Sequence, residues 1–206
     1  LKNIRLREII MVKCLAEEFY SSDLPQTNIL TVLDSVANSP LFKSNGIIAK
    51  NLIARLTELV SGGKAPDFVL KNANNEQKTL NDYKKKYTYI HFFNPESAAS
   101  LIELEPLFKL YEAYKEHVNF ITIYPEKEYS KDVKETKLKL IVWDKFAVAS
   151  NHRMLLNYKI SQYPSYVLID PYGYIVAAPA LTPTPNGQYK TIEQVFFSIK
   201  KLNYKY

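Results

Sequence analysis

The segment Ser61-Gly62-Gly63 divides the sequence into two stretches with different patterns, and this division most constrains how the chain can fold. Before it, apolar residues recur at helical spacing. After it, short runs of aromatic and β-branched residues alternate with helical stretches. Glycine commonly ends helices and joins domains, because it adopts backbone conformations that other residues avoid. We therefore expect a helical segment over residues 1–62 and a second domain over residues 63–206.

Three amphipathic helices are predicted before the glycines. The first runs from Ile4 to Phe19, the second begins at Thr27 as its cap, and the third covers residues 47–59. Asn45-Gly46 is expected to break the chain between the last two. Because the sequence starts at Leu1 in the middle of a helical pattern, without a cap, we interpret it as part of a longer protein.

The second domain shows strand and helix signals in alternation. This order predicts an α/β fold in which helices flank a mixed sheet. The expected strands are residues 87–93, 118–124, 138–142, 166–169 and 174–178, and the expected helices are residues 101–111, 151–158 and 192–202.

Composition excludes several classes of protein. Hydrophobic residues make up 47% of the chain and charged residues 23%, which is typical of a globular protein, and no apolar run is long enough to span a membrane. With 5 glycines and no glycine-rich phosphate loop, no nucleotide cofactor is expected. A single cysteine and three scattered histidines predict no internal disulfide and no metal site.

The net charge of +6 does not by itself indicate a nucleic-acid partner, because the lysines are spread along the chain. Their one short run, Lys84-Lys85-Lys86, is interpreted as a solvated surface. The alternative for this run is contact with an anion or a membrane surface.

Four motifs follow one another in the second domain. They are an opening of the form G-x-x-A-P-D-F-x-L at Gly63–Leu70, a strand leading into a proline-bearing helix at 89–106, the run at 158–170, and the turn at 171–175. In this order they resemble the thioredoxin-like superfamily, in particular the TlpA and ResA branch of thiol-disulfide oxidoreductases of bacterial envelopes. The resemblance implies a thioredoxin-like domain over 63–206, and helical stretches precede such domains in Bacteroides envelope proteins.

The chain departs from this family at its reactive pair, because Ser97 and Ser100 stand where the resemblance places the nucleophilic and the resolving cysteine. A thiolate near a helix N-terminus is the nucleophile in such sites, and the second thiol resolves the mixed disulfide. A serine hydroxyl is neither ionised at neutral pH nor redox active. The sequence as written therefore predicts a redox-inactive site. Either the pair was lost naturally, which leaves a binding module, or two cysteines were replaced by engineering.

The same resemblance assigns the substrate-binding residues. Pro164 matches the family's cis-proline, Tyr163 before it would pair its main chain with an extended substrate, and Glu96 stands beside Ser97. The expected partners are an extended polypeptide or thiol protein and a membrane-anchored redox partner. The expected location is the periplasm or cell envelope.

Other interpretations of the same residues remain to be compared. Ser97 lacks the G-x-S-x-G setting of a hydrolase nucleophile, and its hydroxyl is expected to cap the following helix. A peroxiredoxin-like ancestry fits Pro95 but requires a cysteine that this segment lacks. His91 is interpreted as a core histidine and Cys14 as a small buried hydrophobic residue.

Overall fold

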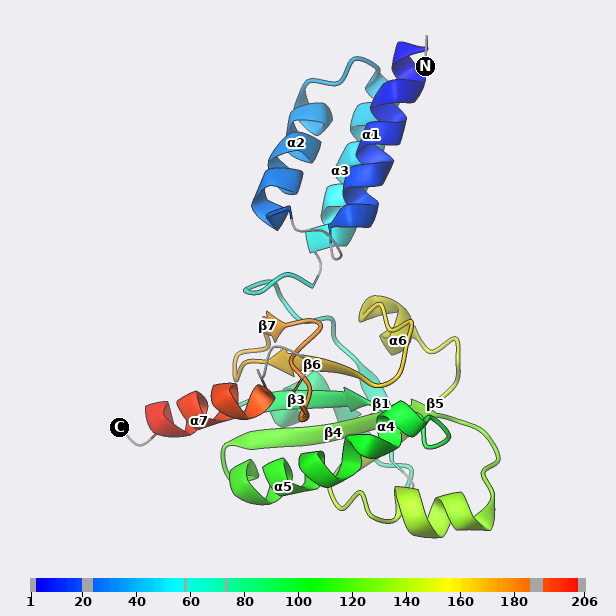
Figure 1. The fold of residues 1–206 in the computed structure, drawn as a ribbon, viewed down its shortest axis with the longest axis vertical. Helices are drawn as coiled ribbons and strands as arrows, with labels where there is room; N and C mark the ends of the chain where they lie inside the picture. The colour runs from blue at the N-terminus through cyan, green and yellow to red at the C-terminus, as the bar shows by residue number, and fades with distance from the viewer. Residues whose placement is uncertain (1–2, 20–23, 58, 73, 186–190, 204–206) are drawn as a thin grey trace. The chain divides into compact units, whose positions relative to one another are not determined.

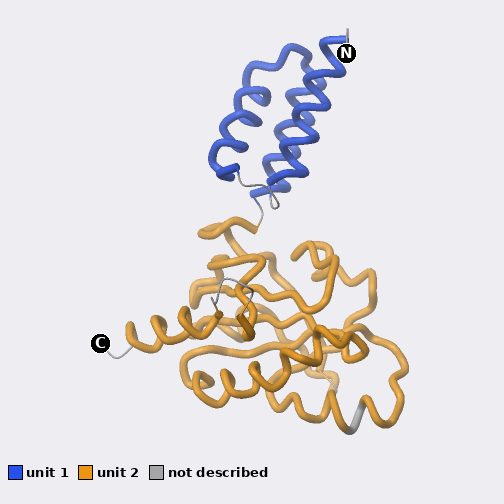
Figure 2. Tube along the Cα trace, viewed as in Figure 1, with its two compact units in different colours: residues 1–58 blue, residues 59–206 orange. Residues whose placement is uncertain are grey.

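The computed structural model describes residues 3–19, 24–57, 59–72, 74–185 and 191–203. Contacts divide the chain into two compact units, residues 1–58 and residues 59–206 (Figure 2). Each unit is described by itself below.

In its described residues, unit 1 contains three helices that pack together (Figure 1). Helix α1 runs over Ile4–Glu18, α2 over Gln26–Asn38 and α3 over Lys43–Thr57. Each helix contributes apolar side chains to the shared core, among which Val12, Leu33 and Ala49 are almost completely buried. Packing of these apolar stripes, rather than intrinsic helix propensity, supplies most of the stability of helices this short.

Asn45 and Gly46, which were expected to break the chain, instead lie buried inside α3. The amide of Asn45 donates to the buried carboxylate of Glu8 at 2.7 Å and to the carbonyl of Arg5 at 3.3 Å, which joins α3 to α1. Glu8 also accepts a hydrogen bond from the main-chain N–H of Leu41 at 2.9 Å. Asn45-Gly46 is therefore held in the helix by the tertiary hydrogen bonds of Asn45, which override the local preference of this pair for a turn.

Two further residues of unit 1 differ from the expectation. Helix α2 is preceded by Pro25 at its N-cap, so Thr27 lies within the helix instead of capping it. Cys14 is exposed, because the buried face of α1 passes through Glu8 and Val12. A residue two positions after Val12 points to the opposite side of the helix.

Unit 2 contains a five-stranded sheet in the order β5-β4-β3-β6-β7. The strands β3, β4 and β5 are parallel, and β6 and β7 continue the sheet in antiparallel orientation. A separate hairpin pairs β1 with β2. The strand bounds are β1 Val69–Lys71, β2 Gln77–Thr79, β3 Tyr87–Phe92, β4 Val118–Pro125, β5 Asp144–Val148, β6 Ser165–Ile169 and β7 Ile175–Ala177.

The two faces of the sheet are covered by different elements. One core cluster joins the sheet to helices α5 and α7, and the other joins it to the β1 hairpin, the 3-10 turn and α6. The helical bounds in this unit are 3-10 turn Leu80–Tyr83, α4 Ala98–Ile102, α5 Leu104–Tyr114, the π-helical segment Val133–Leu138, α6 Arg153–Asn157 and α7 Ile192–Asn203. The α/β fold class predicted from the sequence, a mixed sheet flanked by helices with an N-terminal helical segment, is confirmed.

The strand expected over residues 138–142 is wrong, since the strand lies at Asp144–Val148. Residues 138–142 turn instead, and the ammonium group of Lys145 holds this turn by donating to the carbonyls of Leu138 at 2.7 Å and Ile141 at 2.8 Å. Apolar composition alone does not separate a turn from a strand: Leu140 and Val142 are exposed in this turn, although both are apolar.

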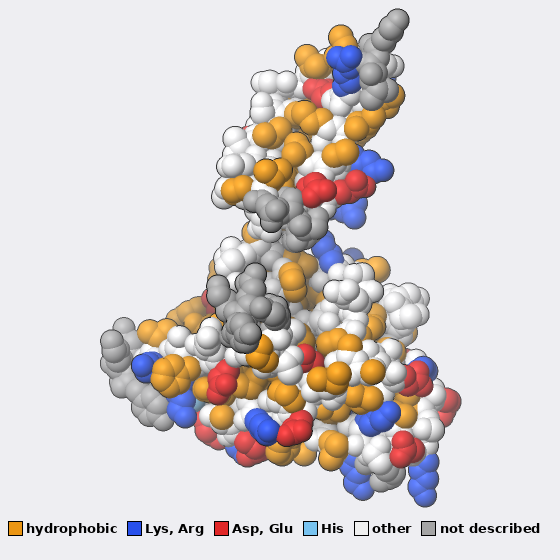
Figure 3. Space-filling view, viewed as in Figure 1, with side chains coloured by type: hydrophobic (Ala, Val, Ile, Leu, Met, Phe, Trp, Pro, Cys, Tyr) orange, Lys and Arg blue, Asp and Glu red, His pale blue; other side chains and the backbone are white. Residues whose placement is uncertain are grey.

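Basic residues in unit 2 are interspersed with acidic and apolar ones over the face seen in Figure 3. In the run of three lysines, Lys84 and Lys85 are exposed, and Lys86 donates to the carbonyl of Lys115 at 3.2 Å.

We expect Gly46→Ala to destabilise unit 1, although Gly→Ala stabilises an open helix position by about 1 kcal/mol. A Cβ at Gly46 would lie 2.7 Å from Cγ of Pro40, so the packing must shift. Overpacking of this kind costs about 1–3 kcal/mol. The measurement is hydrogen-exchange protection of α3 amides in the full chain.

The matched control is the double variant Pro40→Ala/Gly46→Ala, which removes the contact at 2.7 Å with Cγ and should recover part of the lost protection. A stabilising effect of Gly46→Ala alone would show that the close approach of Pro40 does not limit this position.

Candidate functional site

The candidate site lies in the loop that leaves the carboxyl end of β3. This loop is fixed by its own hydrogen bonds: the side chain of Asn94 accepts from the N–H of Glu96 at 3.1 Å, and its carbonyl accepts from the N–H of Ser97 at 3.0 Å. Before it, the N–H of Phe93 donates to the carbonyl of Ile123 in β4 at 2.8 Å. The position of Ser97 is thus set by the sheet.

Ser97 and Ser100 both make hydrogen bonds within this loop. The hydroxyl of Ser97 is the N-cap of α4 and accepts from the N–H of Ser100 at 3.4 Å, so the cap expected from the sequence is present. The hydroxyl of Ser100 is fully buried and accepts from the N–H of Asn94 at 3.3 Å. Ser97 is partly open to solvent and Ser100 is enclosed behind it.

Tyr163 and Pro164 precede strand β6, and the peptide bond between them is cis. The antiparallel pairing of β6 with β3 places Ser165 opposite Phe92. Continuing this register by one and two residues brings Pro164 opposite Phe93 and Tyr163 opposite Asn94, at the start of the loop that carries Ser97. Residues separated by more than sixty positions are thereby brought to the same end of the sheet.

Tyr129 lies in the segment after β4, and its hydroxyl donates to the carbonyl of Pro125 at 2.7 Å. Burial raises the pKa of Tyr129 to about 12, with smaller contributions from the nearby carboxylate of Glu96 and from Tyr124 and Tyr163. Glu96 itself is half-exposed and forms an ion pair with Lys127, whose ammonium group also lies 5.3 Å from the centre of the Tyr129 ring. Glu96 is therefore paired with a basic neighbour at the surface.

Several residues near this site were missed from the sequence. Lys127 and Tyr129 lie in the segment after β4, and only the parallel pairing of β3 with β4 brings them to the loop. Glu103, one helical turn after Ser100, is buried and accepts from the N–H of Thr184 at 3.1 Å and from its hydroxyl. An acidic residue shortly after the serine pair was visible in the sequence, but neither its burial nor its distant partner was.

His91 lies inside the core on β3, as the sequence analysis expected. Its ring stacks on that of Tyr166, with 5.0 Å between centroids, and its Nδ1 lies 3.4 Å from the hydroxyl of Thr122. The indole N–H of Trp143 donates to the same hydroxyl at 2.9 Å. Burial lowers the pKa of His91 to about 3, so the imidazole is neutral at physiological pH.

The described part of the chain shows no cluster of three or more His, Cys, Asp or Glu residues placed to hold a metal ion. Within the same residues, no helix combines the length and the apolar character needed to cross a bilayer.

We expect His91 to make unit 2 less stable as the pH falls. The unfolded chain protonates this imidazole near pH 6.5, whereas the folded protein does so only near pH 3. Between these values the unfolded state binds more protons than the folded state. Each unit decrease in pH therefore lowers the free energy of unfolding by up to ~1.4 kcal/mol. His91→Phe keeps a ring for the stack and should remove this acid slope in denaturant titrations followed by Trp143 fluorescence.

His117→Gln, which removes an imidazole outside the core, is the matched control. An unchanged slope in His91→Phe would assign the acid sensitivity to other groups.

Comparison with known proteins gives the chain a family. No curated protein matches it. Among solved structures it is similar to the thioredoxin domain of a Bacteroides vulgatus thiol-disulfide oxidoreductase, with 22% identity, a TM-score of 0.55, and coverage of 70% of this chain and 98% of that one. A thioredoxin-like protein from Bacteroides caccae is 16% identical with a TM-score of 0.61, covering 96% of this chain and 77% of that one.

A thiol-disulfide oxidoreductase from Bacteroides fragilis is 19% identical with a TM-score of 0.52, over 64% of this chain and 98% of that one. These likenesses establish a thioredoxin-like fold for unit 2. Residues 61–178, more than half of the sequence, match the AhpC/TSA family. The chain belongs to the AhpC/TSA family.

Proposed function

We propose that unit 2 is the thioredoxin-like domain of a thiol-disulfide oxidoreductase acting on envelope proteins, and that it is redox-inactive because Ser97 stands at the nucleophilic position and Ser100 at the resolving position. The observation that supports this most is the arrangement of the two serines. The hydroxyl of Ser97 is partly open to solvent and receives a main-chain N–H, while that of Ser100 lies buried one helical turn behind it. An attacking group needs access, and a resolving group needs protection until the mixed disulfide forms.

The exchange itself requires sulfur at both positions. A thiolate at position 97 would attack one sulfur of a substrate disulfide, forming a mixed disulfide and releasing the other sulfur as a thiolate. The thiol at position 100, after losing its proton, would then attack the sulfur at position 97 and release the second substrate thiolate. The substrate gains two electrons and the domain becomes oxidised. With serine at both positions, neither step occurs.

The surroundings of Ser97 suit a thiolate. The N–H of Ser100 points at the side-chain atom of residue 97, and hydrogen bonds to the charged form of an acid lower its pKa. The adjacent carboxylate of Glu96 opposes this effect, but its ion pair with Lys127 offsets much of the charge. The sole cysteine, Cys14, lies on α1 in unit 1, so exchange or peroxide reduction at this loop would need a thiol that the chain lacks.

A second candidate function is a binding module that uses the surface beside Pro164. It is favoured by the hydrogen bonds of both serines to main-chain N–H groups, because a hydroxyl oxygen accepts such bonds more strongly than sulfur does. In this function Tyr163 and Pro164 would hold an extended polypeptide without forming a covalent bond to it.

We place either activity in the cell envelope or periplasm, with polypeptides or thiol proteins as substrates and a membrane-anchored protein as redox partner. Disulfides persist in oxidising compartments, where exchange of this kind is useful. The bacterial oxidoreductases that share the fold support this placement.

The double substitution Ser97→Cys/Ser100→Cys should give exchange activity. The double substitution is best combined with Cys14→Ser, so that every thiol lies at the site. Its activity is measured as the rate at which dithiothreitol reduces insulin in its presence. We expect at least a tenfold rate increase over the Cys14→Ser parent. Ser97→Cys in the same Cys14→Ser background, incubated with insulin in the absence of dithiothreitol, should accumulate a mixed disulfide with the substrate.

Ser100→Cys alone is the matched control and should remain inactive, because a buried thiol cannot reach the substrate. A double variant that is folded by circular dichroism but inactive would refute the oxidoreductase proposal and leave the binding module.

For the binding module, the unmodified chain should bind reduced and alkylated insulin B chain, and Pro164→Ala should weaken this binding at least fivefold. The proline ring restricts the backbone that presents Tyr163. Isothermal titration calorimetry measures the effect, and Pro171→Ala in the β6–β7 turn is the matched control. Equal loss in both variants would argue against a groove at Pro164.

A further inference from the structure

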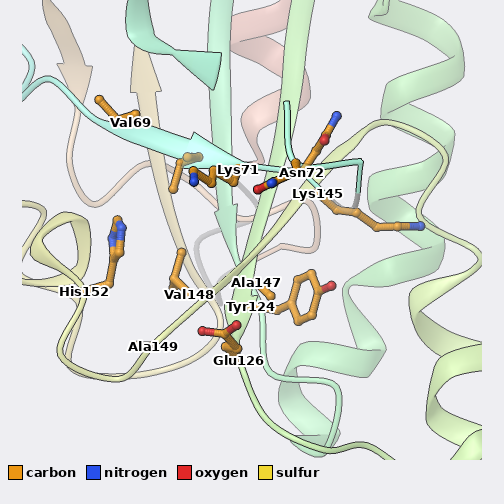
Figure 4. Close-up of a pocket in the computed structure, with 12 residues that line it drawn as sticks. Val69, Lys71, Asn72, Tyr124, Glu126, Lys145, Ala147, Val148, Ala149 and His152 are labelled. Carbon is orange, nitrogen blue, oxygen red and sulfur yellow. The ribbon is translucent and has the colours of Figure 1, made fainter. Parts of the chain in front are cut away.

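Two pockets of unit 2 that include neither Ser97 nor Pro164 differ in the chemistry of their walls. The first lies between β1 and β5 and has Lys71 and Glu126 on opposite sides, so it favours neither an anion nor a cation (Figure 4). The second has a volume of about 430 Å³, within the range of small-molecule sites. We call it the α5 pocket; most of its lining is apolar and consists of Leu101, Leu104, Phe108, Leu140, Ile141 and Trp143.

One wall of the α5 pocket is an apolar stripe along α4 and α5. Leu101, Leu104 and Phe108 follow one another at intervals of three and four residues, which places them on one side of a helix. Glu103, between the two helices, also has right-handed helical backbone angles, so the stripe continues from α4 into α5. Its seven residues of helical rise span about 10 Å, which is long enough for a short hydrocarbon chain to lie along it.

The opposite wall is formed by Leu140 and Ile141. Both lie in the turn over residues 138–142, which the ammonium group of Lys145 holds by two hydrogen bonds to main-chain carbonyls. Trp143 also lines the pocket, and its indole N–H is hydrogen-bonded within the core. Because these groups are already held in place, binding does not have to order them, which lowers the entropic cost of binding a ligand.

The walls suit a hydrocarbon chain better than an extended polypeptide. Phe108 and Leu140 lie on opposite walls and are 43% and 61% exposed, so a ligand between them would remove apolar surface from water. The main-chain groups of α5 are bonded within the helix. An extended polypeptide in this pocket would therefore bury peptide groups without hydrogen-bond partners, which is costly, whereas a hydrocarbon chain has no such groups.

Among the polar residues that line the α5 pocket, Lys137 is the one whose charge is left for a ligand. The carboxylate of Glu105 is paired with Lys109 at 2.7 Å, and the hydroxyl of Thr136 donates to a main-chain carbonyl one helical turn earlier at 2.8 Å. The ammonium group of Lys137 donates to the carbonyl of Pro95 at 3.3 Å, and within the described residues it forms no ion pair. An ammonium group has three donors, so it can also bind a carboxylate.

The hydrogen bond of Lys137 also fixes where such a carboxylate would lie. Pro95 belongs to the loop before α4, whose N-cap is Ser97. The ammonium group is therefore at the end of the α5 pocket where α4 begins, and the apolar stripe leads away from it. Positive charge at one end and apolar walls beyond it are complementary to an amphipathic anion.

We propose that the α5 pocket binds a small amphipathic carboxylate of the fatty-acid class. Its hydrocarbon chain lies along Leu101, Leu104 and Phe108, and its carboxylate pairs with the ammonium group of Lys137. The binding is non-covalent, and it depends neither on the serine pair nor on the surface beside Pro164.

The first experiment titrates the isotope-labelled full chain with decanoate, below its micelle-forming concentration, and follows NMR signals. The amide signals of Leu101, Leu104, Phe108 and Ile141 and the indole signal of Trp143 should shift together. Decylammonium has the same chain and the opposite charge, and it should bind about fivefold more weakly because it meets Lys137 without an ion pair. A capped tripeptide of two leucines and one glutamate should also bind about fivefold more weakly or less, because its peptide groups lack partners.

Two substitutions test the two parts of the site. Phe108→Gln removes apolar surface from one wall at a half-exposed position and should weaken decanoate binding about fivefold. Phe197→Gln is the matched control, because Phe197 is 51% exposed on α7 and does not line the pocket; it should bind like the unmodified chain. Lys137→Gln should reduce the preference for decanoate over decylammonium to less than about twofold.

The proposal is overturned by equal decanoate binding in Phe108→Gln and Phe197→Gln, or by equal affinity of the unmodified chain for decanoate and decylammonium. It is also overturned by tighter binding of the tripeptide, by shifts confined to residues outside the α5 pocket, or by no shifts at millimolar decanoate. Circular dichroism checks that each variant is folded. If Phe108→Gln does not fold, the three probes on the unmodified chain still decide the outcome.

Discussion

The pairing of β3 with strands on both sides is the constraint on which the rest of unit 2 depends. It joins β4 in parallel and β6 in antiparallel orientation, and Tyr89, Ile90 and Phe92 are completely buried. Because its main-chain groups are used on both edges, this strand cannot slide without losing two ladders. The loop that follows it is therefore held in place, and two segments distant in sequence converge on it.

Polar groups near this loop are bonded to main-chain atoms more than to one another. Ser97 and Ser100 receive main-chain N–H groups, and Glu103 receives the N–H of Thr184. Buried polar groups are costly when unpaired, so such bonds make the loop a stable structure with serine in place. The same N–H groups would contact whatever atoms occupied positions 97 and 100, and for this reason the two functions that we propose share one geometry.

The sequence predicted the fold class, the central strands and the loop with its serine pair, because these depend on local patterns and on motif order. It failed where distant contacts decide the structure. Asn45-Gly46 has the local character of a turn, yet hydrogen bonds from Asn45 to Glu8 and Arg5 hold it in a helix. The apolar run 138–142 has the composition of a strand, yet Lys145 fixes it as a turn. Lys127 and Tyr129 reach the site only through strand pairing, which no local signal specifies.

Trp143 has a consequence for how this protein can be observed. It is the only tryptophan in the chain, and its indole N–H is bonded to Thr122, which in turn lies against His91. Its ring also lies 4.9 Å from that of Tyr111 on α5. The emission of this single fluorophore therefore reports on one face of the sheet, next to the strand that leads to the serine pair. The protein carries an optical reporter for the interior behind its candidate site, without any added label.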